Sequence, residues 1–172
     1  MTSDRKTYFI DELKSHYQGL IADARTAETA SAEAAEGVQT EVRRKEDARS
    51  AAAFGRMTAG HRDRRQRAVS ELETLIAFAA RGLPRFGRDS KVALGAFVDV
   101  SIEDESDTEE RTLFILPVGA GVELHGPGGD GFISVVTPGS PVGKALLGAS
   151  RDDAFEIRIA GRDREWLVVD VS

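Results

Sequence analysis

The chain contains no cysteine. Disulfide bonds and thiolate metal sites are therefore excluded, and the composition favours a reducing, cytoplasmic environment. Its three histidines, His16, His61 and His125, are far apart and lack the spacing of metal ligands. We therefore expect no structural zinc site and no metal in the free protein.

Long apolar runs are also missing. No stretch approaches the roughly 20 residues that a membrane-spanning helix needs, and the first residues lack the apolar segment of a secretory signal. We therefore expect no membrane partner.

Catalytic motifs are absent as well. The sequence has no Walker loop, no Gly-x-Ser-x-Gly, no His-Glu-x-x-His and no dinucleotide-binding fingerprint. The acidic segment from Glu103 to Glu110 lacks the spacing of a calcium loop, which favours a solvated loop. The sequence thus predicts a protein that is not a free-standing enzyme and has no cofactor of its own.

The net charge of -6 is unevenly distributed. Residues 1–84 carry 14 Lys/Arg and 13 Asp/Glu, whereas residues 85–172 carry 9 and 16. Nine basic residues and three acidic ones lie between Arg43 and Arg67. Such a local excess attracts a polyanion, although a solvated helix face would carry the same charges.

Two long helices are predicted in the first half. Apolar residues recur every three or four positions from Phe9 to Ala24, which predicts a helix over residues 4–36 that becomes alanine-rich toward its end. A second helix is predicted over residues 46–81. No proline precedes Pro84, so nothing breaks either helix.

We expect these helices to form an antiparallel coiled-coil hairpin over residues 1–84, with a polar tip at about residues 37–50. Bulky apolar residues gather at the open end, and the tip is poor in them. A charged tip on a long rod suits a protein that reaches into a partner, and a dimerising coiled coil is the alternative.

Residues 85–172 alternate short β patterns with turns, which predicts an α+β domain of five or six antiparallel strands and one short helix. We expect five aromatic residues to fill its core: Phe97, Phe114, Phe132, Phe155 and Trp166. The short helix is predicted after Ser140-Pro141, where serine suits an N-cap and proline the first helical position.

The order of strand, Ser140-Pro141, Ala145-Leu146-Leu147-Gly148 and two final strands resembles the C-terminal domain of the GreA/GreB transcription elongation factors. The resemblance extends over the chain, with a hairpin longer than is usual for GreA. It implies a monomer with an FKBP-like C-terminal domain that docks at the rim of the RNA polymerase secondary channel. It also implies that the hairpin tip enters this channel and that its acidic residues share a Mg²⁺ ion with the polymerase active site.

Aligned on the family's tip, Glu46 falls on the essential glutamate and Asp47 on the following asparagine, while Arg43 falls on the family's aspartate. The resemblance thus implies that Glu46 and Asp47, with Glu41 as a further carboxylate, assist the polymerase-bound Mg²⁺. Lys45, Asp47, Arg49 and Phe54 also resemble a longer-hairpin branch of the family.

Two functions follow from the resemblance. In the first, the chain would stimulate cleavage of backtracked RNA. In the second, it would occupy the channel as a regulator that does not cleave, with Arg43 and Arg44 disfavouring Mg²⁺ there. The FKBP-like fold also suggests a prolyl isomerase. This third possibility is weaker, because fold does not imply function.

The remaining site predictions concern binding surfaces. Residues expected to track the nascent RNA 3′ end are Arg56, Arg62, Arg64, Arg65 and Arg67. Residues expected to bind the polymerase are Ser140, Pro141, Lys144 and Leu147.

Overall fold

A computed structural model describes residues 2–41, 45–87, 89–104, 107–128, 131–159 and 161–172. Within these ranges, residues 2–4, 37–41, 45–48, 104, 107 and 159 are described only by their secondary structure. The chain divides into two compact units, one formed by Met1–Leu13 with Thr74–Ser172 and the other by Lys14–Glu73. The predicted domain boundary at residue 84 stays a prediction.

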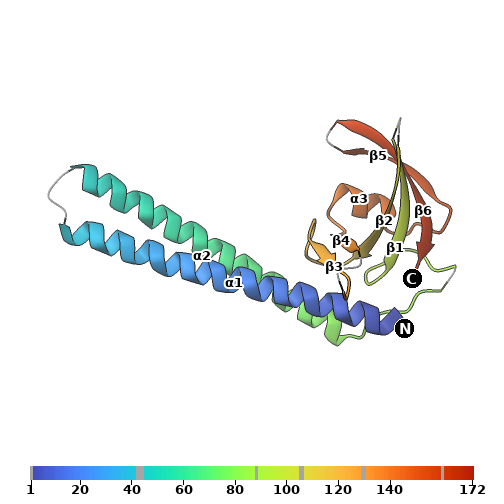
Figure 1. Ribbon diagram of the computed structural model, residues 1–172, viewed down its shortest axis with the longest axis horizontal. Helices are drawn as coiled ribbons and strands as arrows, with labels where there is room; N and C mark the ends of the chain where they lie inside the picture. Colours follow the sequence, from blue (N-terminus) through green and yellow to red (C-terminus); the bar gives the residue numbers. More distant parts are fainter. Residues whose placement is uncertain (1, 42–44, 88, 105–106, 129–130, 160) are drawn as a thin grey trace. The chain divides into compact units, whose positions relative to one another are not determined.

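Two helices account for the first half of the chain. Helix α1 runs over Thr2–Glu41 and α2 over Lys45–Ala80, and they lie side by side as an antiparallel hairpin (Figure 1). Both predicted helices are confirmed, and α1 extends further at each end than its apolar pattern indicated. The added residues, Thr2, Ser3 and Gly37 to Glu41, are mostly weak helix formers, so local propensity does not explain the extension. No described helix is long and apolar enough to cross a membrane.

The second half forms a six-stranded sheet with one short helix. Its elements are β1 (Phe97–Asp104), β2 (Asp107–Ile115), β3 (Glu123–His125), β4 (Phe132–Val136), α3 (Pro141–Leu146), β5 (Ala154–Ile159) and β6 (Arg162–Val171). The strand order is β3-β4-β2-β1-β6-β5. The predicted hairpin followed by a β domain with one short helix is therefore confirmed.

One strand pairing differs from the prediction of a wholly antiparallel sheet. Strand β4 pairs with β2 in parallel, through Leu113↔Ser134 to Ile115↔Val136. The chain leaves β2 and turns back through β3, which is antiparallel to β4, so that β4 regains the direction of β2. The acidic loop is also shorter than expected, because β1 and β2 remain paired as far as Asp104↔Asp107.

The core of this unit lies between one face of the sheet and α3. Val98, Val100 and Ile115 on the strands pack in one cluster with Leu146 of α3. On the opposite face of β1 and β2, Phe97 and Phe114 pack against each other, with ring centroids 4.4 Å apart and ring planes tilted by 42°.

The first turns of α1 belong to the same unit and close the second face of the sheet. Phe9 packs edge-on against Phe97. Leu13 approaches Gly119, where an added Cβ would lie 3.1 Å from the Leu13 side chain. Gly119 also has a positive φ of 91°. This turn therefore requires glycine for its conformation as well as for its contact with α1.

Four of the five predicted core aromatics are buried or partly buried, and Phe132 is not. Phe97, Phe114 and Trp166 are buried and Phe155 packs against the core. Phe132 is 49% exposed, so its prediction was wrong. It begins β4 opposite His125 of the edge strand, before the part of β4 that pairs with β2, and thus has no neighbouring strand on that side.

Candidate functional site

The predicted polymerase-binding segment is the start of α3. Ser140 is the N-cap of this helix: its Oγ accepts a hydrogen bond from the Gly143 amide at 3.0 Å and donates one to the Thr137 carbonyl at 2.8 Å. Pro141 occupies the first turn, as predicted from its fixed φ. Ser140 therefore has a structural function in this turn, whatever it contacts in a partner.

A close approach of backbone to backbone holds this segment in place. A Cβ on Gly143 would lie 2.0 Å from the Thr137 carbonyl oxygen. That separation is impossible for a side-chain carbon, so position 143 requires glycine. The connection between β4 and α3 is thereby fixed before any partner binds.

Three residues of the segment face solvent. Pro141, Lys144 and Leu147 are all exposed, whereas Leu146 is completely buried. Their spacing of three residues places them on one side of α3 and its C-terminal end. This surface presents one cation beside two apolar side chains, a composition suited to a protein contact.

The predicted metal-assisting residues lie at the ends of the two long helices. Glu41 is the last residue of α1, and Glu46 and Asp47 lie in the first turn of α2. The side chains of all three, and residues 42–44 including Arg43, lie outside the described part of the chain. Acidic residues at a helix N-terminus are also favoured by the helix dipole, so Glu46 and Asp47 have a structural reason to be there. No group of three or more His, Asp or Glu among the described residues could hold a metal ion.

The structure separates the predicted RNA-binding arginines into two sets. Arg62 Nε and Arg65 Nε each lie 3.0 Å from a different carboxylate oxygen of Glu28 on α1. These hydrogen bonds lower the pKa of Glu28 below its usual value. Arg62 and Arg65 therefore connect the two helices, and their charges are partly neutralised within the hairpin.

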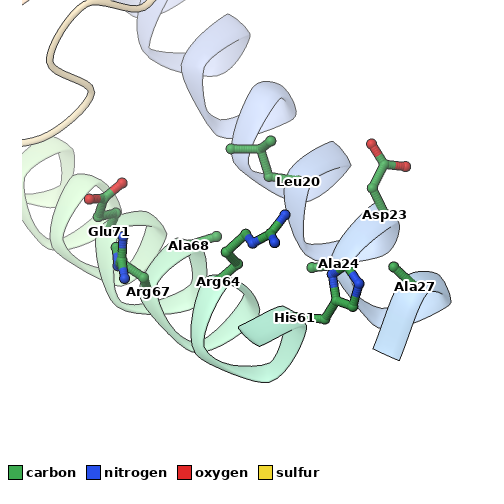
Figure 2. A pocket seen from close by; sticks show the side chains of 9 residues that line it. All are labelled: Leu20, Asp23, Ala24, Ala27, His61, Arg64, Arg67, Ala68 and Glu71. Atoms are coloured by element: carbon green, nitrogen blue, oxygen red, sulfur yellow. The ribbon is translucent and has the colours of Figure 1, made fainter. Parts of the chain in front are cut away.

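The other three arginines, Arg56, Arg64 and Arg67, form no ion pair with any described residue. They lie on one side of α2, and Arg64 and Arg67 border a hollow of about 330 Å³ between α1 and α2. Figure 2 shows Ala24, Ala27 and Ala68 at this hollow, with the longer side chains around them. The hollow exists because alanine side chains leave the space between the helices unfilled.

Two features here were missed from the sequence. Glu28 has no distinctive sequence signal, although an acid one helix away from a cluster of arginines is an expected pairing. Lys6 is only 2% exposed, with its Nζ 3.1 Å from the Pro84 carbonyl oxygen and 4.6 Å from the Phe86 ring centroid. Burial lowers the pKa of Lys6 to about 8. Its position after Arg5 in a polar N-terminal segment gave no indication of burial.

A buried tyrosine lies near one end of the hollow. Tyr17 is 2% exposed, and burial, with a further contribution from the Glu71 carboxylate, raises the pKa of its phenol well above the usual value. Glu71 also lines the hollow. The phenol is therefore neutral at physiological pH and acts as part of the packing between the helices.

Comparison with known proteins gives one decisive match. Residues 88–172 match the family model described as "Transcription elongation factor, GreA/GreB, C-term". This range contains every strand of the sheet, α3 and the capped Ser140-Pro141 turn. No curated protein matches the chain.

Several solved structures are similar over most of the chain. GreA factor homolog 1 (Gfh1) of Thermus thermophilus is 19% identical over 92% of this chain and 94% of its own, with a TM-score of 0.37. Thermus aquaticus Gfh1 is 15% identical over 91% of this chain and 92% of its own, with a TM-score of 0.35. A GreA/GreB elongation factor from Nitrosomonas europaea is 19% identical over 60% of this chain and 92% of its own, with a TM-score of 0.34. The assignment rests on the match of residues 88–172: the chain belongs to the GreA/GreB family of transcription elongation factors.

Proposed function

We propose that the chain binds RNA polymerase at the rim of the secondary channel and inserts its hairpin tip to stimulate cleavage of backtracked RNA. The observation that carries this proposal is the family domain at residues 88–172, joined to a hairpin of a 40-residue and a 36-residue helix. At a rise of about 1.5 Å per residue, such helices extend roughly 50–60 Å, long enough to reach deep into a channel.

In this proposal the exposed side of α3 contacts the polymerase. Lys144 supplies a cation, and Pro141 and Leu147 supply apolar area on the same side. Ser140 and Gly143 hold these residues in place through the capped turn. The docking surface is thus formed in the free protein, which reduces the entropic cost of binding.

The tip would supply carboxylates to the polymerase active site. Oxygen ligands of this kind suit Mg²⁺, and a second metal ion there would stabilise the attacking and leaving oxygens of phosphodiester hydrolysis. Glu46 and Asp47 would be the assisting pair, with Glu41 at the end of α1 as a further donor. The chain would contribute these groups to the partner's catalysis and would not act as an enzyme alone.

A second candidate function is occupation of the channel without cleavage. Arg43 stands where the family has an aspartate, and a cation at that position would repel Mg²⁺. The chain would then alter initiation or pausing by obstructing the channel.

Transcript cleavage in stalled, backtracked complexes of the cognate polymerase tests the proposal. With Mg²⁺, the wild-type protein should produce shortened RNAs that can be extended again. Glu46→Ala and Asp47→Ala should each abolish this activity while leaving polymerase binding unchanged. Cleavage by both variants at the wild-type rate would refute the assignment of the tip carboxylates.

The two candidates are separated by the wild-type result and by one further variant. Binding without cleavage, together with competition against a cleavage-active Gre factor, would establish the regulator. Arg43→Asp should then confer cleavage, because it restores the carboxylate that the family has at this position.

A further inference from the structure

A groove runs along one side of α2 from Ala53 to Glu71. It consists of the hollow of about 330 Å³ already described and a second one of about 410 Å³, and both are lined by His61 and Arg64. The two hollows therefore adjoin at these two residues. A span of 18 residues corresponds to roughly 27 Å along a helix, the length of about five helical turns.

Small residues line much of the groove, and exposed apolar side chains lie beside them. Leu20 is 43% exposed and Met57 is 51% exposed. The small lining residues are Ala24, Ala27, Ala53, Gly60 and Ala68. This surface leaves apolar area in water that a partner could cover.

The charges along the groove are mainly positive. Arg56, Arg64 and Arg67 line it, and none of them pairs with an acid among the described residues, in contrast to Arg62 and Arg65. Unpaired guanidinium groups beside apolar surface favour a ligand that presents carboxylates or phosphates next to an apolar body.

We propose that this groove binds an amphipathic helix of a protein partner that carries carboxylates along the edges of its apolar stripe. Leucine-sized side chains of the partner would fill the space above the alanines and contact Leu20 and Met57. Its carboxylates would pair with Arg56, Arg64 and Arg67. A helix laid into a groove on a helical surface is a common mode of recognition, and it matches this groove in length and in composition.

The residues that line the groove favour a protein ligand over RNA. Single-stranded RNA is held by aromatic stacking as well as by cations, and neither hollow is lined by Phe, Tyr or Trp. Asp23 and Glu71 also line the groove, where they would repel the unbroken row of phosphates of RNA, whereas a helix presents its carboxylates only at intervals. This inference goes beyond the cleavage function and depends on neither the tip carboxylates nor α3.

The experiment measures binding of three fluorescently labelled probes to the full chain by anisotropy. The first is a designed peptide of about three heptads with leucines at a and d and glutamates at e and g. The second replaces those glutamates with lysines, and the third is a single-stranded RNA of about 12 nucleotides. We expect the glutamate peptide to bind at least tenfold more tightly than either of the others.

Two variants locate the binding site. Arg64→Gln combined with Arg67→Gln should weaken binding of the glutamate peptide about tenfold, and Met57→Gln should weaken it about threefold. Arg81→Gln combined with Arg162→Gln removes the same charge at exposed positions outside the groove and should have no effect. Circular dichroism should show unchanged helix content in every variant.

Three results would overturn the proposal. Equal weakening by the groove variant and its charge-matched control would make the attraction nonspecific. Tighter binding of RNA, lost in the groove variant, would make this an RNA-binding face. Self-association of the chain that Met57→Gln abolishes would make it a dimer contact. Because no arm measures RNA cleavage, failure here is distinguishable from failure of the proposed function.

Discussion

The two compact units of this protein are stabilised in different ways. In the unit that contains the sheet, large side chains such as Phe97, Phe114 and Leu146 are completely buried. Among the described residues of Lys14–Glu73, the buried ones are Tyr17, Ser31 and Ala68. Packing therefore fixes the first unit, whereas helix propensity and a few pairs across the hairpin hold the second.

This difference bears on function. A unit held by packing tolerates few substitutions, which suits a domain whose binding surface has to keep its shape. A hairpin held by alanines and surface ion pairs can exchange most of its exposed residues without losing its form. We expect differences in activity within such a fold to arise in the hairpin.

The largest expected effect is the contrast between truncating a large apolar side chain in the sheet unit and truncating one in the hairpin. Phe114→Ala should lower the free energy of unfolding by about 3–5 kcal/mol, because it removes a fully buried ring. Leu20→Ala in the hairpin should cost less than about 1 kcal/mol, because Leu20 is 43% exposed. Urea titration measures both, and similar costs would contradict the contrast between the units.

A second, smaller effect concerns Lys6 and depends on pH. Its pKa is about 8 in the folded state, against 10.5 in the unfolded chain. The unfolded chain therefore binds more protons between these values, and stability should rise as pH increases from 8 to 10.5, by up to about 3 kcal/mol. Lys6→Met should remove this rise. Parallel pH profiles of the two proteins would show that the ammonium is not held in a buried site.

The smallest effect is expected at the hairpin ion pairs. Glu28→Gln removes the carboxylate shared by Arg62 and Arg65 and should lower the melting temperature slightly at low salt. The difference from wild type should vanish in concentrated salt, where exposed charges are screened. It should also fade at acidic pH, because Glu28 has a lowered folded-state pKa and its contribution is lost as it becomes protonated. A lower melting temperature that persists in high salt would indicate that Glu28 stabilises the hairpin through packing and not through its charge.

Most of the fold was predictable because local patterns and tertiary structure agree. Helical spacing of Phe9 and Leu13 predicted α1, and both are buried. The capped turn at Ser140 was predicted from its side-chain chemistry and is confirmed to the level of its hydrogen bonds. The parallel pairing of β4 with β2 was missed, because the direction of a strand depends on the path of the chain between strands.

The site was less predictable, since it depends on which face each residue takes. The helical spacing from Phe9 to Ala24 places Leu20 on the apolar stripe of α1, yet Leu20 is 43% exposed and borders the hollow where α2 presents the small Ala68. The five predicted arginines are equivalent in sequence, but Glu28 engages only two of them. Burial of Lys6 requires Pro84 and Phe86, which are far from it in sequence.

The measurement that tests the central claim most directly is polymerase affinity and transcript cleavage, determined together for one variant of each region. Lys144→Glu in the docking surface should weaken polymerase binding about tenfold or more and reduce cleavage in proportion, while the exposed control Lys91→Glu should not. Glu46→Ala at the tip should bind normally and fail to stimulate cleavage. Loss of affinity in the tip variant with full affinity in Lys144→Glu would contradict the division into a docking domain and an acting hairpin.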